Sequence, residues 1–268
     1  MKIRVISALL MLPLLLVVYL GGPLLIIVTF LIGLLGIREF FGAFERVKIK
    51  GSYVVANVSI LLLYGINLFF KHFEQYSILY MFWLTVVLML SFLYIFNIRK
   101  RKINDAFVTL LGIVYVIFFS FHVVLVDQTG QYNILIWLIF ITAFGTDIFA
   151  YFTGMLIGKH KLCPDISPKK TIEGAVGGVI GSLILSSLFG FIFCKEYLIY
   201  CIIIGIIGSI MSQVGDLSAS IVKRKLKIKD YGKLIPGHGG ILDRFDSVLF
   251  TAPTVYYFII AINIINSI

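Results

Sequence analysis

The chain has 268 residues, of which 60% are hydrophobic and 13% are charged, and its formal net charge is +10. A water-soluble domain of this size cannot bury so much apolar surface. The apolar residues form long runs instead of short alternating segments, which excludes a soluble protein and a membrane β-barrel and predicts membrane helices of about 20 residues. Because the basic residues lie in short connections between these runs, membrane topology explains them better than nucleic-acid binding.

Nine apolar runs follow one another without a long polar stretch between them. We therefore expect an all-α polytopic membrane protein with about nine transmembrane helices. The first run resembles a signal peptide, but no small-x-small cleavage site follows it, so we expect a retained helix. The predicted spans are residues 3–20, 23–37, 53–70, 77–98, 105–126, 132–157, 172–194, 197–215 and 247–267.

Lys and Arg are distributed unequally between the two sides of these predicted spans. One side carries 21 of the 23 basic residues, and the other side carries only Lys71 and Lys195. Basic connections remain in the cytosol, so we expect a cytosolic N-terminus, an external C-terminus and a location in the inner (cytoplasmic) membrane. The basic side consists of the N-terminus and the connections near residues 38–50, 99–102, 159–170 and 223–244.

Five acidic residues lie at or toward the predicted cytosolic side of four C-terminal spans. Asp147 lies inside a span, where a carboxylate is a functional candidate by default. Glu173 opens the seventh span, Asp216 closes the eighth, and Asp243 and Asp246 open the ninth on one helical face. Clustered carboxylates repel each other unless a cation holds them, and oxygen ligands suit Mg²⁺. We predict a magnesium site formed by Asp216, Asp243, Asp246 and Asp147.

Cationic side chains occupy the same region, and mixed charges at a membrane surface indicate a phosphorylated substrate bound together with a metal ion. We assign phosphate binding to Lys223, Arg224 and Arg244, each of which lies near an acidic candidate in the sequence. For Lys225 and Lys227 we favour contact with lipid head groups and a role in topology.

Two glycine-rich stretches have different interpretations. His238 lies between glycines that permit an unusual turn and a close approach to a ligand, so we favour a site role over a structural one. The seventh span has overlapping small-xxx-small patterns, which favour close helix packing over a phosphate-binding loop. Its glycines are Gly174, Gly177, Gly178 and Gly181.

The stretch 220–246 resembles the signature of the phosphatidate cytidylyltransferases (CDP-diacylglycerol synthases). It reads SIVKR, four residues, KDYG, two residues and IPGHGGILDRFD. The blocks DIFAYFTG at 147–154, SPKKTIEG at 167–174 and GDLSAS at 215–220 are similar to the same family. The specific resemblance covers residues 147–246, and the N-terminal half matches only in its hydrophobicity.

The resemblance implies that CTP and phosphatidate react to give CDP-diacylglycerol and pyrophosphate, with Mg²⁺ and, as an open alternative, a second metal ion. Membrane lipids are expected partners, nucleic acid is not, and a homodimer is implied by the family alone. The implied catalytic residues are Asp216, Lys223, Arg224, His238, Asp243, Arg244 and Asp246. The implied substrate-binding residues are Ser167, Lys169, Lys170, Thr171, Glu173, Ser220, Gly239 and Gly240. For Ser167 and Thr171, capping of the seventh span is an equally good interpretation.

We expect two domains: N-terminal membrane helices at 1–98, for anchorage, a lipid entrance or an interface, and a catalytic membrane domain at 99–268 whose active site faces the cytosol. A transporter or channel is an alternative because of the carboxylate in a span, although paired repeats of broken helices are not evident. A CTP-dependent polyprenol kinase and a cytidylyltransferase for another lipid are closer alternatives.

Overall fold

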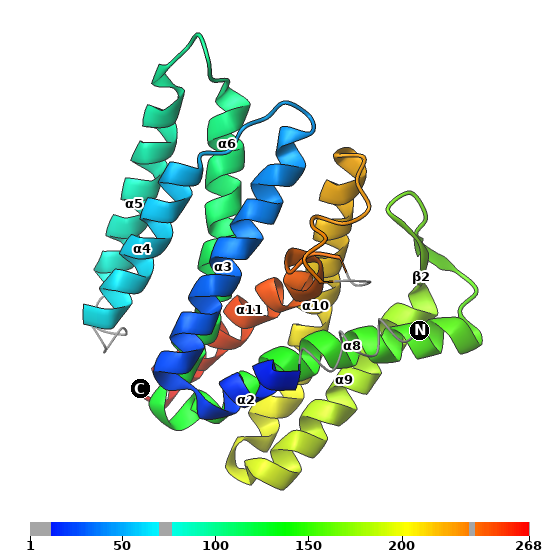
Figure 1. Ribbon diagram of the computed structural model, residues 1–268. Helices are drawn as coiled ribbons and strands as arrows, with labels where there is room; N and C mark the ends of the chain where they lie inside the picture. Colours follow the sequence, from blue (N-terminus) through cyan, green and yellow to red (C-terminus); the bar gives the residue numbers. More distant parts are fainter. Residues whose placement is uncertain (1–11, 70–76, 236–238, 268) are drawn as a thin grey trace. The chain divides into compact units, whose positions relative to one another are not determined.

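The computed structural model describes residues 12–69, 77–235 and 239–267, and most of them are helical (Figure 1). The long elements are α2 (Leu12–Leu20), α3 (Gly22–Glu45), α4 (Tyr53–Phe69), α5 (Ser77–Leu93), α6 (Ile103–Gly112), α7 (Phe119–Asp127), α8 (Ile136–Ile157), β1 (Lys161–Cys163), β2 (Ser167–Thr171), α9 (Ile172–Phe193), α10 (Leu198–Lys225) and α11 (Leu242–Asn266). Short helical segments are η2 (Tyr94–Phe96), η3 (Ile113–Phe118), η4 (Gly130–Leu135) and η5 (Lys195–Tyr197).

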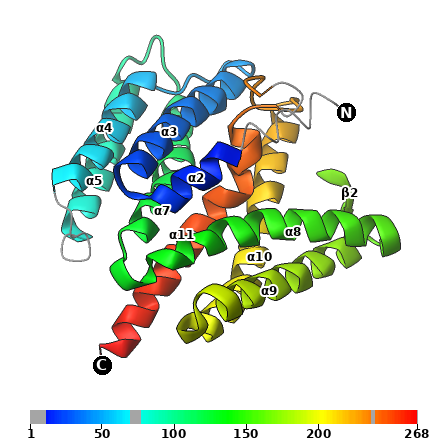
Figure 2. The same cartoon turned by 60° about the horizontal axis from the view of Figure 1, so that its bottom comes forward.

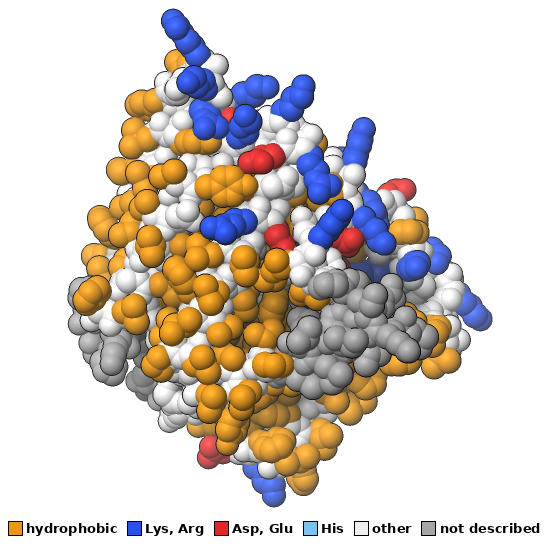
Figure 3. All heavy atoms as spheres, viewed as in Figure 1, with side chains coloured by type: hydrophobic (Ala, Val, Ile, Leu, Met, Phe, Trp, Pro, Cys, Tyr) orange, Lys and Arg blue, Asp and Glu red, His pale blue; other side chains and the backbone are white. Residues whose placement is uncertain are grey.

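Long apolar helices confirm the predicted fold class, an all-α polytopic membrane protein. Among the described residues, seven helices have the length and composition needed to cross a membrane, and α4 is a shorter apolar helix. Large hydrophobic side chains remain exposed on them, for example Phe69 at 86% and Leu156 at 75%. Figure 3 shows hydrophobic side chains along α3 to α5, with Lys and Arg at the end where the α3–α4 and α5–α6 connections run. The predicted number of nine spans and the orientation stay predictions.

Two helices extend well beyond the predicted ends of their apolar runs. Helix α3 continues to Glu45 because Phe40 and Phe41, after the charged pair Arg38 and Glu39, are fully buried. Helix α10 continues to Lys225, and its basic last turn is favourable at the negative end of a helix dipole. The predicted ends at residues 37 and 215 were therefore wrong, since tertiary packing and end charges continue both helices past the hydrophobic limit.

The chain forms two compact packing units. Unit 1 contains Met1–Phe121 and Ile228–Arg244, and unit 2 contains His122–Lys227 and Phe245–Ile268. These units describe contacts only, so the functional division near residue 98 stays a prediction.

Unit 1 packs α3 to α6 side by side. The buried Trp83 on α5 donates from Nε1 to the Ser59 carbonyl oxygen on α4, 2.9 Å away. The buried carboxylate of Asp105 accepts bonds from the backbone N–H groups of Lys50 at 2.8 Å and Lys102 at 2.9 Å. Asp105 therefore holds the α3–α4 and α5–α6 connections together.

Unit 2 contains α8, α9 and α10 in mutual contact, and Figure 2 shows α8 and α9 running alongside each other. A Cβ atom on Gly174 would lie 2.8 Å from the Ala150 carbonyl oxygen, and one on Gly178 would lie 3.0 Å from that of Thr146. A Cβ atom on Gly177 would collide with the Thr153 side chain, and one on Gly181 would collide with that of Phe149. The interpretation of these glycines as close helix packing is confirmed.

A small hairpin joins α8 to α9, where the sequence suggested only a basic connection. Strands β1 and β2 are antiparallel, and Lys161 pairs with Thr171 while Cys163 pairs with Ser167. Thr171 then caps α9, because its Oγ1 accepts a bond from the Gly174 N–H at 3.1 Å. The capping interpretation is confirmed for Thr171 but was wrong for Ser167, which lies at the start of β2, four residues before the N-cap.

Candidate active site

A cavity of about 350 Å³ opens within unit 2 between α8, α9, α10 and the hairpin. Five predicted site residues line it, and these five come from α8, β2 and α10. The lining residues are Asp147, Ala150, Tyr151, Gly154, Met155, Leu162, Lys169, Lys170, Thr171, Gly174, Ala175, Gln213 and Asp216. The cavity therefore combines anionic and cationic side chains with an apolar wall.

An ion pair between Lys170 and Asp216 joins the hairpin to α10 in this cavity. The side chains are 29% and 24% exposed, respectively, so both remain accessible from the cavity. Ser220, one turn later on α10, donates from Oγ to the other Asp216 carboxylate oxygen at 3.5 Å. The ammonium group thus has a fixed position in which it can also meet an anionic ligand.

A second carboxylate, that of Asp246, lies in unit 2 near the start of α11. Gly215 on α10 allows the backbone of α11 to come close at this point, because a Cβ atom on Gly215 would lie only 2.7 Å from the Asp246 carbonyl oxygen. Asp246 is 7% exposed, and the charged groups that act on it are Asp216, Lys223 and Asp147. Two of the other predicted metal ligands, Asp216 and Asp147, thus lie within electrostatic range of Asp246.

The donor chemistry of this cluster fits a hard divalent cation, since every charged acceptor is a carboxylate oxygen and a cation would offset their mutual repulsion. Within the described parts of the chain, no group of three or more His, Cys, Asp or Glu side chains is close enough to hold a metal by itself. The magnesium site with four carboxylate ligands therefore stays a prediction.

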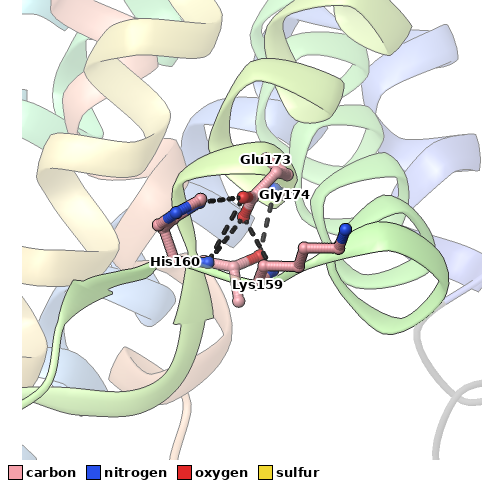
Figure 4. Close-up of polar contacts among 5 residues, drawn as sticks. Lys159, His160, Glu173 and Gly174 are labelled. Carbon is pink, nitrogen blue, oxygen red and sulfur yellow. Dashed lines mark hydrogen bonds and ion pairs between the residues drawn. The ribbon is translucent and has the colours of Figure 1, made fainter.

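Glu173, which we predicted to bind substrate, is instead engaged with the residues before β1. Its carboxylate accepts backbone N–H bonds from Lys159 at 3.1 Å and His160 at 3.2 Å, and lies 2.6 Å from His160 Nδ1. Figure 4 shows the carboxylate pointing toward this backbone and ring. Glu173 is absent from the cavity lining, so its visible role is to fix the base of the hairpin.

Arg224 fixes the other end of the hairpin. Its Nε donates to the Ile166 carbonyl oxygen, 3.0 Å away, in the turn between β1 and β2. Arg224 remains exposed. Arg224 therefore has a structural contact in addition to the phosphate-binding role that we predicted.

The remaining predicted residues belong to unit 1. One oxygen of Asp243 accepts the N–H groups of Tyr231 at 2.8 Å and Gly240 at 3.0 Å, so this predicted metal ligand also shapes its own loop. Gly239 has a φ of +86°, as expected for a glycine in a special turn. The Nε atom of Arg244 is buried without a hydrogen-bond partner among the described residues. His238 lies outside the described residues.

Sequence reasoning missed three residues with evident roles. Tyr151 and Gln213 line the cavity, and helical spacing could have revealed both, because they lie four residues after Asp147 and three before Asp216. Glu39 was assigned to a connection, yet it contacts the start of α11. Local sequence contains no signal for a contact across 202 residues.

Comparisons with known proteins show the family to which the chain belongs. Residues 2–262 match the cytidylyltransferase family. The chain is similar to phosphatidate cytidylyltransferase of Staphylococcus haemolyticus, with 33% identity over 94% of this chain and 96% of the relative. It is 34% identical to that of Staphylococcus saprophyticus over 98% of this chain and 100% of the relative. A 124-residue region is 48% identical to that of Synechocystis, covering 46% and 42% of the two chains.

The family match covers nearly the whole chain, and the two staphylococcal relatives align over almost their full lengths. Residues of the three shorter blocks that resemble the family line the cavity, and the end of the 220–246 signature forms the start of α11. The protein is therefore a member of the cytidylyltransferase family.

Proposed function

We propose that this protein transfers a cytidylyl group from CTP to phosphatidate, giving CDP-diacylglycerol and pyrophosphate for phospholipid synthesis. The observation that carries the proposal is the family match over residues 2–262, in a membrane protein whose cavity presents lysines and carboxylates together. The names of the relatives supply the substrate class, and the charged cavity suits phosphate groups.

The chemical step needs no covalent enzyme intermediate. One phosphate oxygen of phosphatidate attacks the α-phosphorus of CTP, a new P–O bond forms, and the bond from the α-phosphorus to the bridging oxygen breaks. Pyrophosphate leaves with that electron pair. The nucleophile is already largely ionised near neutral pH, so the protein must mainly align two anions and offset their charge.

Charged residues of the chain take complementary roles in this step. Lys169 and Lys170 line the cavity and would hold phosphate groups. Lys223, Arg224 and Arg244 are further phosphate contacts in the proposal. Mg²⁺, for which Asp216 and Asp246 with Asp147 and Asp243 are the proposed ligands, would supply positive charge to the phosphates, with a second metal ion as an alternative.

Charge distribution supports a specific membrane placement. We propose an inner (cytoplasmic) membrane protein whose active site faces the cytosol, because 21 of 23 basic residues fall on one predicted side. CTP would enter from the cytosol, and the acyl chains of phosphatidate would enter sideways from the bilayer between helices. A homodimer is a further proposal, which cross-linking in native membranes would test.

Purified protein in detergent micelles with phosphatidate, Mg²⁺ and radiolabelled CTP should form a labelled lipid and release pyrophosphate. Chelation of Mg²⁺ should abolish the product, and Asp246→Asn should lower kcat by about 10²–10³-fold, the scale of losing one charge-stabilising group. Glu196→Gln, at the exposed η5 segment, is the matched control. A labelled lipid that survives Asp246→Asn would contradict the site, and folded wild-type protein that forms no labelled lipid from phosphatidate would contradict the reaction.

A further inference from the structure

The Glu39 carboxylate on α3 binds the beginning of α11 within unit 1. Its two oxygens accept the backbone N–H groups of Ile241 at 3.1 Å and Leu242 at 2.9 Å. The first N–H groups of a helix lack partners within the helix, and a negative charge there is favourable. Glu39 therefore supplies from a distant helix the cap that α11 lacks locally, since Ile241, the residue before α11, has an apolar side chain.

Two glycines that precede α11 in unit 1, Gly232 and Gly240, lie close to Glu39. A Cβ atom on Gly232 or on Gly240 would collide with the Glu39 carboxylate group. The backbone at Gly232 and the backbone at Gly240 thus approach the same carboxylate. Side chains at these two positions would displace the Glu39 carboxylate.

A second contact comes from the next residue of α3. Phe40 is fully buried and its ring stacks on that of Tyr231, with centroids 6.2 Å apart and planes inclined by 29°. The N–H group of the same Tyr231 donates to the Asp243 carboxylate at 2.8 Å. Two neighbouring residues of α3 therefore contact Tyr231 and the first turn of α11.

From these contacts we propose that Glu39 is a positioning residue of the transferase: it fixes the backbone at Gly232 and Gly240 and the first turn of α11, so that Asp243 and Arg244 are held in the conformation used with substrate. The proposal rests on the function proposed above, and it gives the N-terminal helices a part in activity beyond anchorage. Glu39 itself touches no reacting group in this proposal, and it acts through the backbone that it caps.

Glu39→Gln tests this role, because the amide keeps the size of the side chain and replaces one acceptor oxygen by a donor that repels the helix N–H group. We expect kcat/KM to fall about 10–100-fold. We also expect backbone amide hydrogen exchange to rise at residues 239–243. Exchange in α4, α5 and α9 should stay at wild-type values, and so should the thermal midpoint of unfolding in detergent. Glu45→Gln, at the exposed last turn of the same helix, should leave all of these unchanged.

A suppressor pair gives an independent measurement. Gly232→Ala should lower kcat/KM because the new methyl group meets Glu39, and the shorter side chain of Glu39→Asp should restore part of that loss in the double variant. This rescue is expected of direct contact and not of two separate defects.

Three outcomes would overturn the positioning role. Glu39→Gln could show wild-type hydrogen exchange and wild-type kcat/KM, or it could raise exchange at residues 239–243 without lowering kcat/KM. In the third outcome, the loss of kcat/KM accompanies a lower thermal midpoint and a rise in exchange throughout the protein. The exchange readout does not depend on catalysis. Absence of CDP-diacylglycerol synthesis by the folded wild-type protein would therefore refute the proposed function separately from the contact.

Discussion

Lys170 and Asp216 illustrate how single charged residues act in this cavity. The ion pair holds the ammonium group at a defined point on the wall, so its position is set before a ligand arrives. Charge that is already in place costs no reorganisation during a reaction, which is why such groups contribute strongly to phosphoryl transfer. The Asp216 carboxylate in turn offsets the charge of the lysine while the cavity is empty of substrate phosphate.

Lys170→Gln should lower kcat/KM for CTP-dependent lipid synthesis by about 10²-fold, the order expected when one charge-stabilising group is removed. Steady-state kinetics in micelles would measure it. Lys161→Gln is the matched control, since Lys161 is an exposed lysine of the same hairpin outside the cavity lining. Equal losses in both variants would mean that general hairpin charge, and not the Lys170 position, supports the reaction.

At the scale of elements, close helix packing determines where the carboxylates lie. Gly215 lets α10 and α11 approach within unit 2, next to Asp216 on one helix and Asp246 on the other. The hairpin is attached separately, through Glu173 at its base and Arg224 at its turn. Loss of either attachment would leave the helices intact but release the strand that carries Lys169 and Lys170.

Gly215→Ala should separate the carboxylates of α10 and α11 and lower kcat by at least about 10-fold. Overpacking of this kind costs about 1–3 kcal/mol of unfolding free energy, so the thermal midpoint should also fall. Gly65→Ala in α4 is the control, because a Cβ atom there meets nothing within 4 Å. Wild-type activity of Gly215→Ala would show that this close approach is unimportant for the site.

At the scale of the whole molecule, two properties indicate how the protein lies in a membrane: the length of its apolar helices and the unequal distribution of Lys and Arg between alternate connections. Seven described helices can span a bilayer, and the basic residues fall mainly in alternate connections. The orientation follows from this distribution as a prediction, because Lys and Arg in short connections resist translocation. It would place the hairpin and the α10–α11 connection on the cytosolic side.

Cysteine labelling tests this orientation. In a background with the three native cysteines replaced, Lys233→Cys should react with a membrane-impermeant maleimide only in inside-out vesicles. Lys195→Cys should react in intact spheroplasts. The reverse pattern would invert the topology, and reaction of both positions from one side would contradict the predicted number of spans between them.

Sequence alone determined the class of protein, most helix positions and the residues of the signature, because apolar length and charge placement are local properties of the chain. It also indicated correctly that the glycines of α9 pack against a neighbouring helix. Only the tertiary structure decided that Glu173 holds the hairpin, that Lys170 pairs with Asp216, and that Glu39 caps α11. These contacts join residues far apart in the chain, and their geometry depends on how helices pack, which no local periodicity contains.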